Sequence, residues 1–597
     1  MIASEVEPGR RSLLERRSVF FVALASLLGI SLAAEFRSYA RPDTGFLLDA
    51  AARVLDGARL YVDVVEINPP LIIALNMVAV LSARLLHISD ILAYRLGFTA
   101  ALVGTLFLAG WLLRLLFPRE IVVRRAFVLI LAFVLFPLAG QDFGEREHLV
   151  LALLVPYLLL ATARGLGRDI GRMPGLIIGL LAGLALALKP HFLLLWLAVE
   201  CYLRASRRMD PKRVLPETVA IAALLATYGI ALLALTPQYM NLVYLLAGPY
   251  SRFLHDPFFH VLVTGPGAIL VIFALLAFAA LRPHARHTEL WQSIALGAAA
   301  CLMVGAAQQK GLRYHLYPSF ALGTVLLGLI AWDTVRPVRD RLRLTYRWLA
   351  VAVLAATVIV VCAQNLAVAT GTGGDGDRDQ FEDLVRVVRA RAAGETVYVM
   401  SYHLRSAYPL INYSGARSAS RFPHLWILAA EYTDQLRSGG PLEYHAVREM
   451  SPSERYLNRA VLDDLREHRP RLLVIFRHGR DLPVNGLRRL NYVAYFSRHP
   501  DIARILLDYQ LIAELRDYLV YERLPSGGAR SGAPPMVTPG THDVIAVQES
   551  GVRLRFTDPS FLIAVLAFLI GLITIAILER EGEREQSASR VPVPRGE

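Results

Sequence analysis

The segment PPLIIALNMVAVLSARLL, from Pro69 to Leu86, decides the membrane topology of this chain, because it is nearly apolar enough to cross a bilayer. The chain as a whole is also apolar: of its 597 residues, 55% are hydrophobic and only 19% are charged. Its mean hydropathy is +0.44. This composition excludes a soluble enzyme of several domains, so we expect a polytopic α-helical membrane protein.

Other apolar stretches are long enough, or nearly long enough, to span a bilayer, and we expect about 12 transmembrane helices plus juxtamembrane helices. Two neighbouring stretches, 173–188 and 191–203, are short, so that either both cross or neither does. The predicted spans are 18–35, 91–117, 124–139, 148–163, 173–188, 191–203, 214–236, 258–281, 290–306, 317–332, 347–369 and 557–578.

Arginine-rich loops indicate on which side of the membrane each segment lies. If 69–86 does not cross, every arginine-rich loop faces the cytoplasm, as the positive-inside rule requires; if it crosses, all of them face outward. We therefore expect 69–86 to lie in the outer interface or to re-enter, after the break at Pro69-Pro70. Because the net charge of +13 is spread over these loops, we expect no nucleic-acid partner.

This topology divides the chain into three parts. Residues 1–369 form a transmembrane module with a first outer loop at 36–90, residues 370–556 form a periplasmic soluble domain, and 557–597 hold the last span and a cytoplasmic tail. The soluble domain is predicted to be α/β, because residues 396–401 and 471–476 have the pattern of short buried strands and follow the helix-like segments 381–391 and 460–468. We expect a multi-pass protein of a bacterial inner (plasma) membrane.

The first outer loop contains a candidate site residue, Asp43. Apolar residues recur at helical spacing between Thr44 and Asp56, which predicts an amphipathic helix lying on the membrane with Asp43 or Thr44 as its N-cap. Asp43 is then held at the boundary between water and headgroups. The simpler alternative is that Asp43 only caps this helix. Further along the loop, Glu66 and Asn68 precede the double proline and are predicted to support the acceptor side of the site.

Three further outer turns are rich in ionisable side chains. Cations on the outer side depart from the positive-inside bias, and a departing phosphate needs such donors. The ordinary alternatives are a solvated turn, the end of a helix, and basic side chains that only reach toward the interface. The candidates are Asp142 and Glu145 in QDFGEREH (141–148), Lys189 and His191 in LKPHF (188–192), and Lys310, Arg313, Tyr314 and His315 in QQKGLRYHLYP (308–318).

Together these loops resemble the GT-C superfamily of integral membrane glycosyltransferases, in particular the branch with the protein O-mannosyltransferases and the lipid A aminoarabinose transferases. The resemblance covers residues 18–370 and rests on Asp43 after the first helix, Pro69-Pro70-Leu71, the acids Asp142 or Glu145, and the Lys/Tyr/Pro loop 310–318. This chain departs from the branch at Thr44, where Glu is frequent. It departs again at Asn68, where the branch has Lys or His.

The resemblance implies a glycosyltransferase that moves a sugar from a polyprenyl-phosphate-linked donor to a glycan, lipid or protein acceptor, with inversion and with Asp43 as general base. Asp142 and Glu145 then orient the acceptor or hold a divalent cation; no cofactor and no metal-ligand set is assigned. A flippase or transporter for lipid-linked saccharide, or a noncatalytic assembly subunit, remains an alternative. In the resemblance, the departing phosphate is neutralised by Lys189, His191, Lys310, Arg313, Tyr314 and His315.

Overall fold

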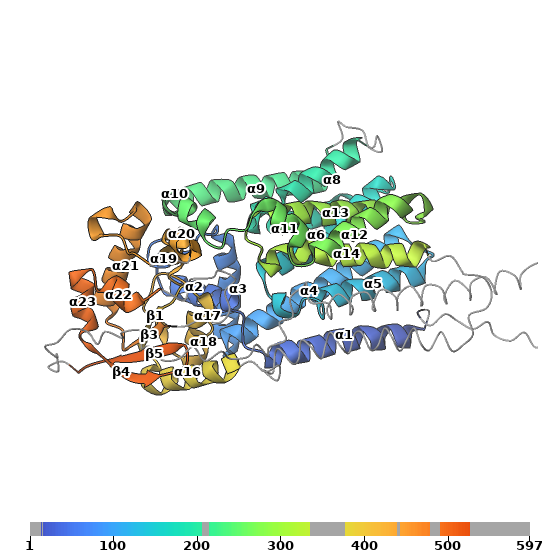
Figure 1. Ribbon diagram of the computed structural model, residues 1–597. Coiled ribbons are helices and arrows are strands. Elements are labelled where there is room, and N and C mark those ends of the chain that lie inside the picture. Colours follow the sequence, from blue (N-terminus) through green and yellow to red (C-terminus); the bar gives the residue numbers. More distant parts are fainter. Residues whose placement is uncertain are drawn as a thin grey trace, which may run out of the picture.

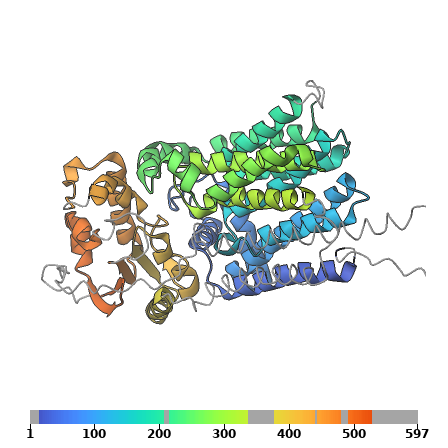
Figure 2. The same cartoon turned by 45° about the vertical axis from the view of Figure 1, so that its right-hand side comes forward.

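The computed structural model describes residue 14 and residues 16–205, 214–334, 376–438, 442–477 and 490–525. Residues up to 334 form a helical bundle, and residues 376–525 form a smaller part that contains a β-sheet (Figure 1). The long helices of the bundle run side by side along one direction. A second view confirms that the sheet-containing part lies at one end of the bundle (Figure 2).

Each predicted span between residues 18 and 332 contains a helix, whereas the predicted spans 347–369 and 557–578 lie outside the described residues. Within the described residues, five helices are long and apolar enough to cross a membrane, or six if one bent pair counts as a single span. These five are α1, α4, α6, α9 and α13. The helices of the bundle are α1 (Arg17–Arg37), α4 (Asp90–Leu116), α5 (Ile121–Leu135), α6 (Arg146–Gly165), α7 (Arg172–Leu188), α8 (Leu193–Ala205), α9 (Pro216–Leu235), α10 (Pro237–Arg252), α11 (Phe258–Thr264), α12 (Ala268–Leu281), α13 (Thr288–Ala307) and α14 (Arg313–Thr334).

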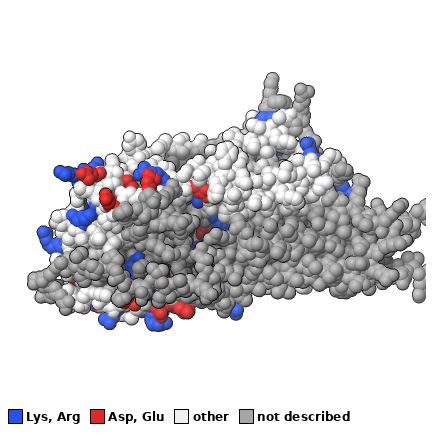
Figure 3. Space-filling model, viewed as in Figure 1, with Lys and Arg blue, Asp and Glu red and all other residues white. Residues whose placement is uncertain are grey.

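The surface of the bundle fits an apolar environment. Charged side chains are sparse on the described surface of the bundle that faces the viewer, and they gather over the sheet-containing part (Figure 3). The helices α5, α7 and α8 have 15, 17 and 13 residues, respectively, and are shorter than a typical span of about 20 residues. Crossing by these three helices stays a prediction.

The predicted span at 258–281 is not one continuous helix. Its two halves, α11 and α12, are bent by 72° with respect to each other. The break falls at Gly265-Pro266-Gly267, where Pro266 lacks an N–H and Gly267 has a φ of +81°. A Cβ at Gly267 would collide with the ring of Phe320 on α14, so this glycine also permits the close packing of the two segments. The helix α10 was not predicted at all.

Residues 36–90, predicted to be the first outer loop, form two helices, α2 (Pro42–Leu55) and α3 (Leu71–Leu86), at the end of the bundle nearest the sheet (Figure 1). The predicted N-cap is wrong: Arg41 caps α2, and Asp43 lies in its first turn. α2 also does not lie open on a surface. It packs against α3 and α4 and, in addition, against the short helices α17 (Leu404–Ala407) and α18 (Leu410–Ser414) of the sheet-containing part.

The sheet has five strands in the order β2-β1-β3-β5-β4. β1, β2 and β3 are parallel, and β5 pairs antiparallel with β3 and β4. Both predicted strands are present as β1 and β3, and both helix-like segments lie within α16 and α21. The elements are β1 (Thr396–Met400), β2 (Arg417–Ser418), β3 (Leu472–Phe476), β4 (Tyr509–Glu514), β5 (Tyr518–Arg523), α16 (Gly376–Ala392), α19 (Trp426–Glu431), α20 (Thr433–Ser438), α21 (Pro452–His468), α22 (Tyr492–Phe496) and α23 (Pro500–Leu506).

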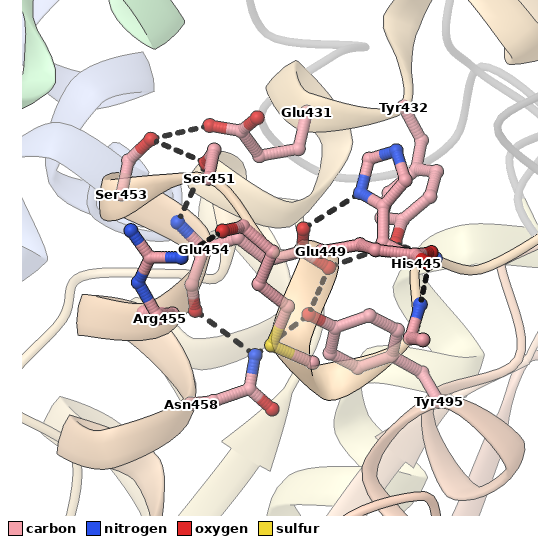
Figure 4. A network of polar contacts seen from close by, with 12 residues as sticks. Glu431, Tyr432, His445, Glu449, Ser451, Ser453, Glu454, Arg455, Asn458 and Tyr495 are labelled. Carbon is pink, nitrogen blue, oxygen red and sulfur yellow. Dashed lines mark hydrogen bonds and ion pairs between the residues drawn. The ribbon is translucent and has the colours of Figure 1, made fainter.

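A buried carboxylate fixes the helices of this part to one another (Figure 4). One oxygen of Glu454, in the first turn of α21, accepts hydrogen bonds from the hydroxyls of Tyr432 and Tyr495, each at 2.7 Å. The Nδ1 atom of His445 lies 2.7 Å from the other oxygen. Because the carboxylate is fully buried and each oxygen has a partner, this network stabilises the packing of α21 against α22 and the segment after α19.

Candidate functional site

Segments that are far apart in the sequence meet around Arg146, the first residue of α6. The Arg146 guanidinium interacts electrostatically with Glu147, Glu66, Asp43 and Tyr314. The structure therefore brings the start of α2, the end of the first outer loop, the run 141–148 and the start of α14 to one place. This site lies at the end of the bundle where α2 and α3 are found (Figure 1).

Asp43 is partly exposed in the first turn of α2, where the N-terminal end of the helix favours a negative charge. Within the described residues, no hydrogen bond reaches its carboxylate. Burial raises the pKa of Asp43, Arg146 and Lys189 lower it, and the nearby acid Glu66 raises it. A carboxylate with no hydrogen-bond donor, with an elevated pKa and with access from outside has the properties of a general base.

Glu145 interacts electrostatically with Asp43. Burial, followed by the charge of Asp43, raises the pKa of Glu145 well above its usual value. The repulsion between the two charges disfavours the ionisation of both carboxylates at once, and the Arg146 charge acts on both. The backbone before Glu145 is held in place, because the hydroxyl of Tyr94 donates to the carbonyl of Gly144, a residue with a φ of +85°.

Lys189 forms a buried ion pair within the protein, so its charge is already partly neutralised. Its Nζ lies 2.8 Å from Oε1 of Glu147, a carboxylate with no exposed surface. Nε2 of His315 lies 3.6 Å from the same oxygen. Burial lowers the pKa of Lys189, and the charge of Glu147 opposes this shift. His191, at the same turn, is exposed and senses the charges of Lys189 and Glu147.

Asp142 is also paired. Arg313 faces it with two nitrogens: Nε lies 3.1 Å from Oδ1 and Nη2 lies 3.1 Å from Oδ2. Burial raises the pKa of Asp142, whereas Arg313 lowers it. The turn before Asp142 is held by Arg41, whose Nη2 donates to the carbonyl of Gly140 at 3.1 Å. The paired geometry favours a role in joining the turn 140–142 to the start of α14.

Lys310 has partners that the sequence did not suggest. Its Nζ donates to the carbonyl oxygens of Tyr250 and Phe253 at the C-terminal end of α10, and it lies 4.5 Å from the centre of the Tyr250 ring. Burial lowers the pKa of Lys310 to about 8. Cations are favourable at the C-terminal end of a helix, so Lys310 anchors α10 to the turn before α14.

Glu66 and Asn68 hold the end of the first outer loop in shape. The backbone N–H of Asn68 donates to Oε1 of Glu66 at 2.7 Å, and the Asn68 side-chain amide donates to the same atom. The hydroxyl of Tyr61 donates to the carbonyl of Asn68 at 2.9 Å. Glu66 is buried and remains within electrostatic range of Asp43 and Arg146.

Three residues of the site were not among the sequence candidates: Arg146, Glu147 and Tyr250. Arg146 and Glu147 belong to the same segment, 141–148, as Asp142 and Glu145. The high density of charged residues in this segment could have indicated both of them. Tyr250 lies on the unpredicted helix α10, and its hydroxyl senses the charges of Arg146, Glu66, Glu147 and Asp43. In the described ranges, no group of three His, Cys, Asp or Glu side chains has the geometry to hold a metal ion.

No family model and no curated protein matches the chain. Among solved structures, the chain is similar to ArnT from Cupriavidus metallidurans bound to undecaprenyl phosphate, with a TM-score of 0.51 and 12% identity over 86% of this chain and 99% of that one. It is similar to apo ArnT from the same organism with a TM-score of 0.50 and 13% identity, over 84% and 97% of the two chains. At this identity the likeness shows that the chain shares the fold of ArnT, whereas the number of spans stays a prediction.

Proposed function

We propose that this protein is a membrane glycosyltransferase that moves a sugar from a polyprenyl-phosphate-linked donor to an acceptor on the periplasmic face of the bacterial inner membrane. The observation that carries this proposal is the juxtaposition of a partly exposed carboxylate, Asp43, with the guanidinium of Arg146. The fold shared with ArnT, which was crystallised with undecaprenyl phosphate, supports a lipid-phosphate donor. The acceptor is a glycan, a lipid or a protein.

The proposed reaction is a single displacement with inversion. Asp43 accepts the proton of an acceptor hydroxyl while that oxygen attacks the anomeric carbon of the sugar. The bond between the anomeric carbon and the phosphate oxygen breaks on the opposite face, and its electron pair leaves with the polyprenyl phosphate. The phosphate gains one negative charge in this step, so a cation beside it lowers the barrier.

Arg146 is the best-placed cation for the departing phosphate. Within the part of the chain that the structure describes, Arg146 forms no ion pair, and its Nε is buried with no hydrogen-bond partner. A planar guanidinium binds phosphate oxygens in pairs, which suits this role. Tyr314 adds a hydroxyl near the same charges. Lys189 adds a positive charge, which it shares with Glu147. Burial lowers the pKa of His191 and of His315, so these two neutral imidazoles contribute hydrogen-bonding groups and no charge.

The roles proposed for the other predicted residues follow from their partners. Glu145 helps to orient the acceptor, because its proton-bearing form can donate a hydrogen bond beside Asp43. Asp142 and Arg313 join the turn 140–142 to α14, and Lys310 anchors α10. Glu66 and Asn68 shape the first outer loop and hold an acid near Asp43.

Release of free polyprenyl phosphate separates an enzyme from a flippase and from a noncatalytic subunit. Purified protein in lipid nanodiscs is incubated with synthetic polyprenyl-phosphate sugars and a bacterial envelope extract that contains lipids, glycans and proteins as the acceptor source. We expect release by the wild-type protein and a loss of roughly 10²- to 10⁴-fold in Asp43→Asn. Asp56→Asn, at the other end of α2, is the matched control and keeps full activity. Wild-type turnover in Asp43→Asn removes the base assignment, and no release by the wild type refutes the proposed function.

A further inference from the structure

The sheet-containing part packs against the first turns of α2, close to Asp43. Nδ2 of Asn412, on α18, donates to the carbonyl oxygen of Gly45 at 3.0 Å. A Cβ at Gly45 would lie 2.7 Å from Oδ1 of Asn412 and 3.3 Å from backbone and side-chain atoms of Pro409 and Tyr408. A larger residue at this position would displace the Asn412 amide and crowd Pro409, so the two surfaces are in direct contact two residues from Asp43.

A second contact lies one turn further along α2. The hydroxyl of Tyr408 donates to Oδ2 of Asp49 at 2.7 Å, and the Tyr408 ring packs edge-on against Phe46 with centroids 5.4 Å apart. Burial raises the pKa of Asp49, whereas Arg53 and the Tyr408 hydroxyl lower it. Asp49 is half-buried, and Arg53 on the same helix lies 3.9 Å from the same oxygen. The Tyr408 hydroxyl is therefore the hydrogen bond that ties this carboxylate, and with it this side of α2, to the sheet-containing part.

Both flanks of α2 are tied to the same part of the molecule. Before the helix, the N–H of Ala40 donates to the hydroxyl of Tyr413 at 3.1 Å. After the helix, the N–H of Val65 donates to the carbonyl of Arg421 at 2.7 Å. The segment before α2, the first turns of α2 and the segment after it are therefore all held by residues 408 to 421.

We infer that the sheet-containing part positions the Asp43 carboxylate through α2, with Tyr408 and Asn412 as positioning residues. This inference rests on the proposed function, because it concerns the placement of the proposed base. A 14-residue helix is marginally stable without tertiary contacts, so packing decides where its first turn lies. A base that is displaced by about 1 Å can lose roughly 100-fold in rate, so contacts of this kind matter for turnover. The sheet-containing part is then a component of the catalytic unit.

The test uses Asn412→Ala, Tyr408→Phe and the double variant in the full-length protein. We expect kcat to fall by about tenfold or more in the double variant, while the KM for the donor changes less, because donor contacts stay in place. Hydrogen exchange of the α2 amides is expected to become faster, with exchange in α13 unchanged. The matched controls lie in the same part and do not touch α2. Tyr509→Phe removes a hydrogen bond to the carbonyl of Pro470, and Asn458→Ala removes hydrogen bonds to the carbonyl of Glu454 and to the hydroxyl of Tyr495.

Two substitutions of Asp49, which accepts the hydrogen bond from Tyr408, give a second test. Asp49→Asn retains an oxygen that accepts from Tyr408 and is expected to keep most of the activity, whereas Asp49→Leu loses this oxygen and resembles Tyr408→Phe. Unchanged kcat in the double variant, or unchanged exchange of the α2 amides, overturns the inference. Absence of turnover in the wild-type protein refutes the proposed function instead, and the exchange measurement still decides whether these residues hold α2.

Discussion

The ammonium of Lys189 lies 2.8 Å from the carboxylate of Glu147, and the side chains are exposed by only 8% and 0%. Lys189 follows the last turn of α7, and Glu147 belongs to the first turn of α6. The pair thus joins two helix ends at the site and uses a cation that the sequence had suggested for phosphate. Arg146, next to Glu147 in the chain, is left as the main cation beside Asp43.

Breaking the Lys189–Glu147 pair is expected to destabilise the protein. Lys189→Met leaves a buried carboxylate without its main partner, and such losses cost roughly 3–5 kcal/mol. The double variant Lys189→Met/Glu147→Gln removes both charges and is expected to be more stable than Lys189→Met alone. Thermal unfolding in detergent micelles measures both. The exposed pair Arg84–Asp56 is the control: Arg84→Gln is expected to cost only about 0–1 kcal/mol. Equal stability of the single and double variants contradicts the prediction.

Replacing Arg146 is expected to impair the use of the donor. Arg146→Gln removes the guanidinium that we assign to the departing phosphate, and kcat/KM for a synthetic polyprenyl-phosphate sugar is expected to fall by about 10²- to 10³-fold. Arg146→Lys keeps a charge but loses the paired donors, so it recovers only part of this loss. Arg59 forms an exposed ion pair with Asp63 in the segment after α2. Arg59→Gln serves as the control and is expected to retain activity. A normal kcat/KM in Arg146→Gln excludes Arg146 from the donor site.

The pH dependence of turnover is expected to follow Asp43. The base must be ionised to accept a proton, and its pKa is raised by burial. Turnover therefore falls as the pH drops through a value above about 3.9, the usual value for Asp. The partners shift this acidic limb in opposite directions: Arg146 lowers the pKa of Asp43 and Glu66 raises it. When the remaining activity of each variant is measured against pH, the pH at which activity is half lost on acidification is expected to be higher in Arg146→Gln and lower in Glu66→Gln than in the wild type. Shifts in the same direction argue against Asp43 as the titrating group.

The stability of the protein is expected to depend on Lys310 at alkaline pH. Burial lowers the pKa of Lys310 to about 8 in the folded protein, whereas an unfolded lysine titrates near about 10.4. Between these values the unfolded chain binds one more proton at this site, so the Lys310 contribution to stability rises with pH. The neutral amine still has two N–H groups for the carbonyls of Tyr250 and Phe253. The unfolding midpoints of the wild type and of Lys310→Gln are measured at pH 8 and at pH 10. We expect the midpoint of the wild type, relative to that of Lys310→Gln, to be higher at pH 10 than at pH 8. A constant difference shows that Lys310 does not titrate in this window.

The sequence by itself determined which segments form helices in the bundle. Ten apolar stretches between residues 18 and 332 contain helices, because a helix satisfies its backbone hydrogen bonds within the segment and needs no distant partner. The strands β1 and β3 were also predictable, since a short run of buried β-branched and aromatic residues has few alternatives. The sequence further indicated which loops contain the ionisable side chains of the site.

Only the tertiary structure decided how those side chains are paired. Lys189 pairs with Glu147, Arg313 pairs with Asp142, and Lys310 binds two carbonyls of α10. Each of these contacts joins residues far apart in the chain, and local pattern carries no information about such distances. The bend between α11 and α12 and the packing of the sheet-containing part on α2 have the same origin. Burial then fixed which groups are charged, because the energy of a charge depends on the neighbours that folding places around it.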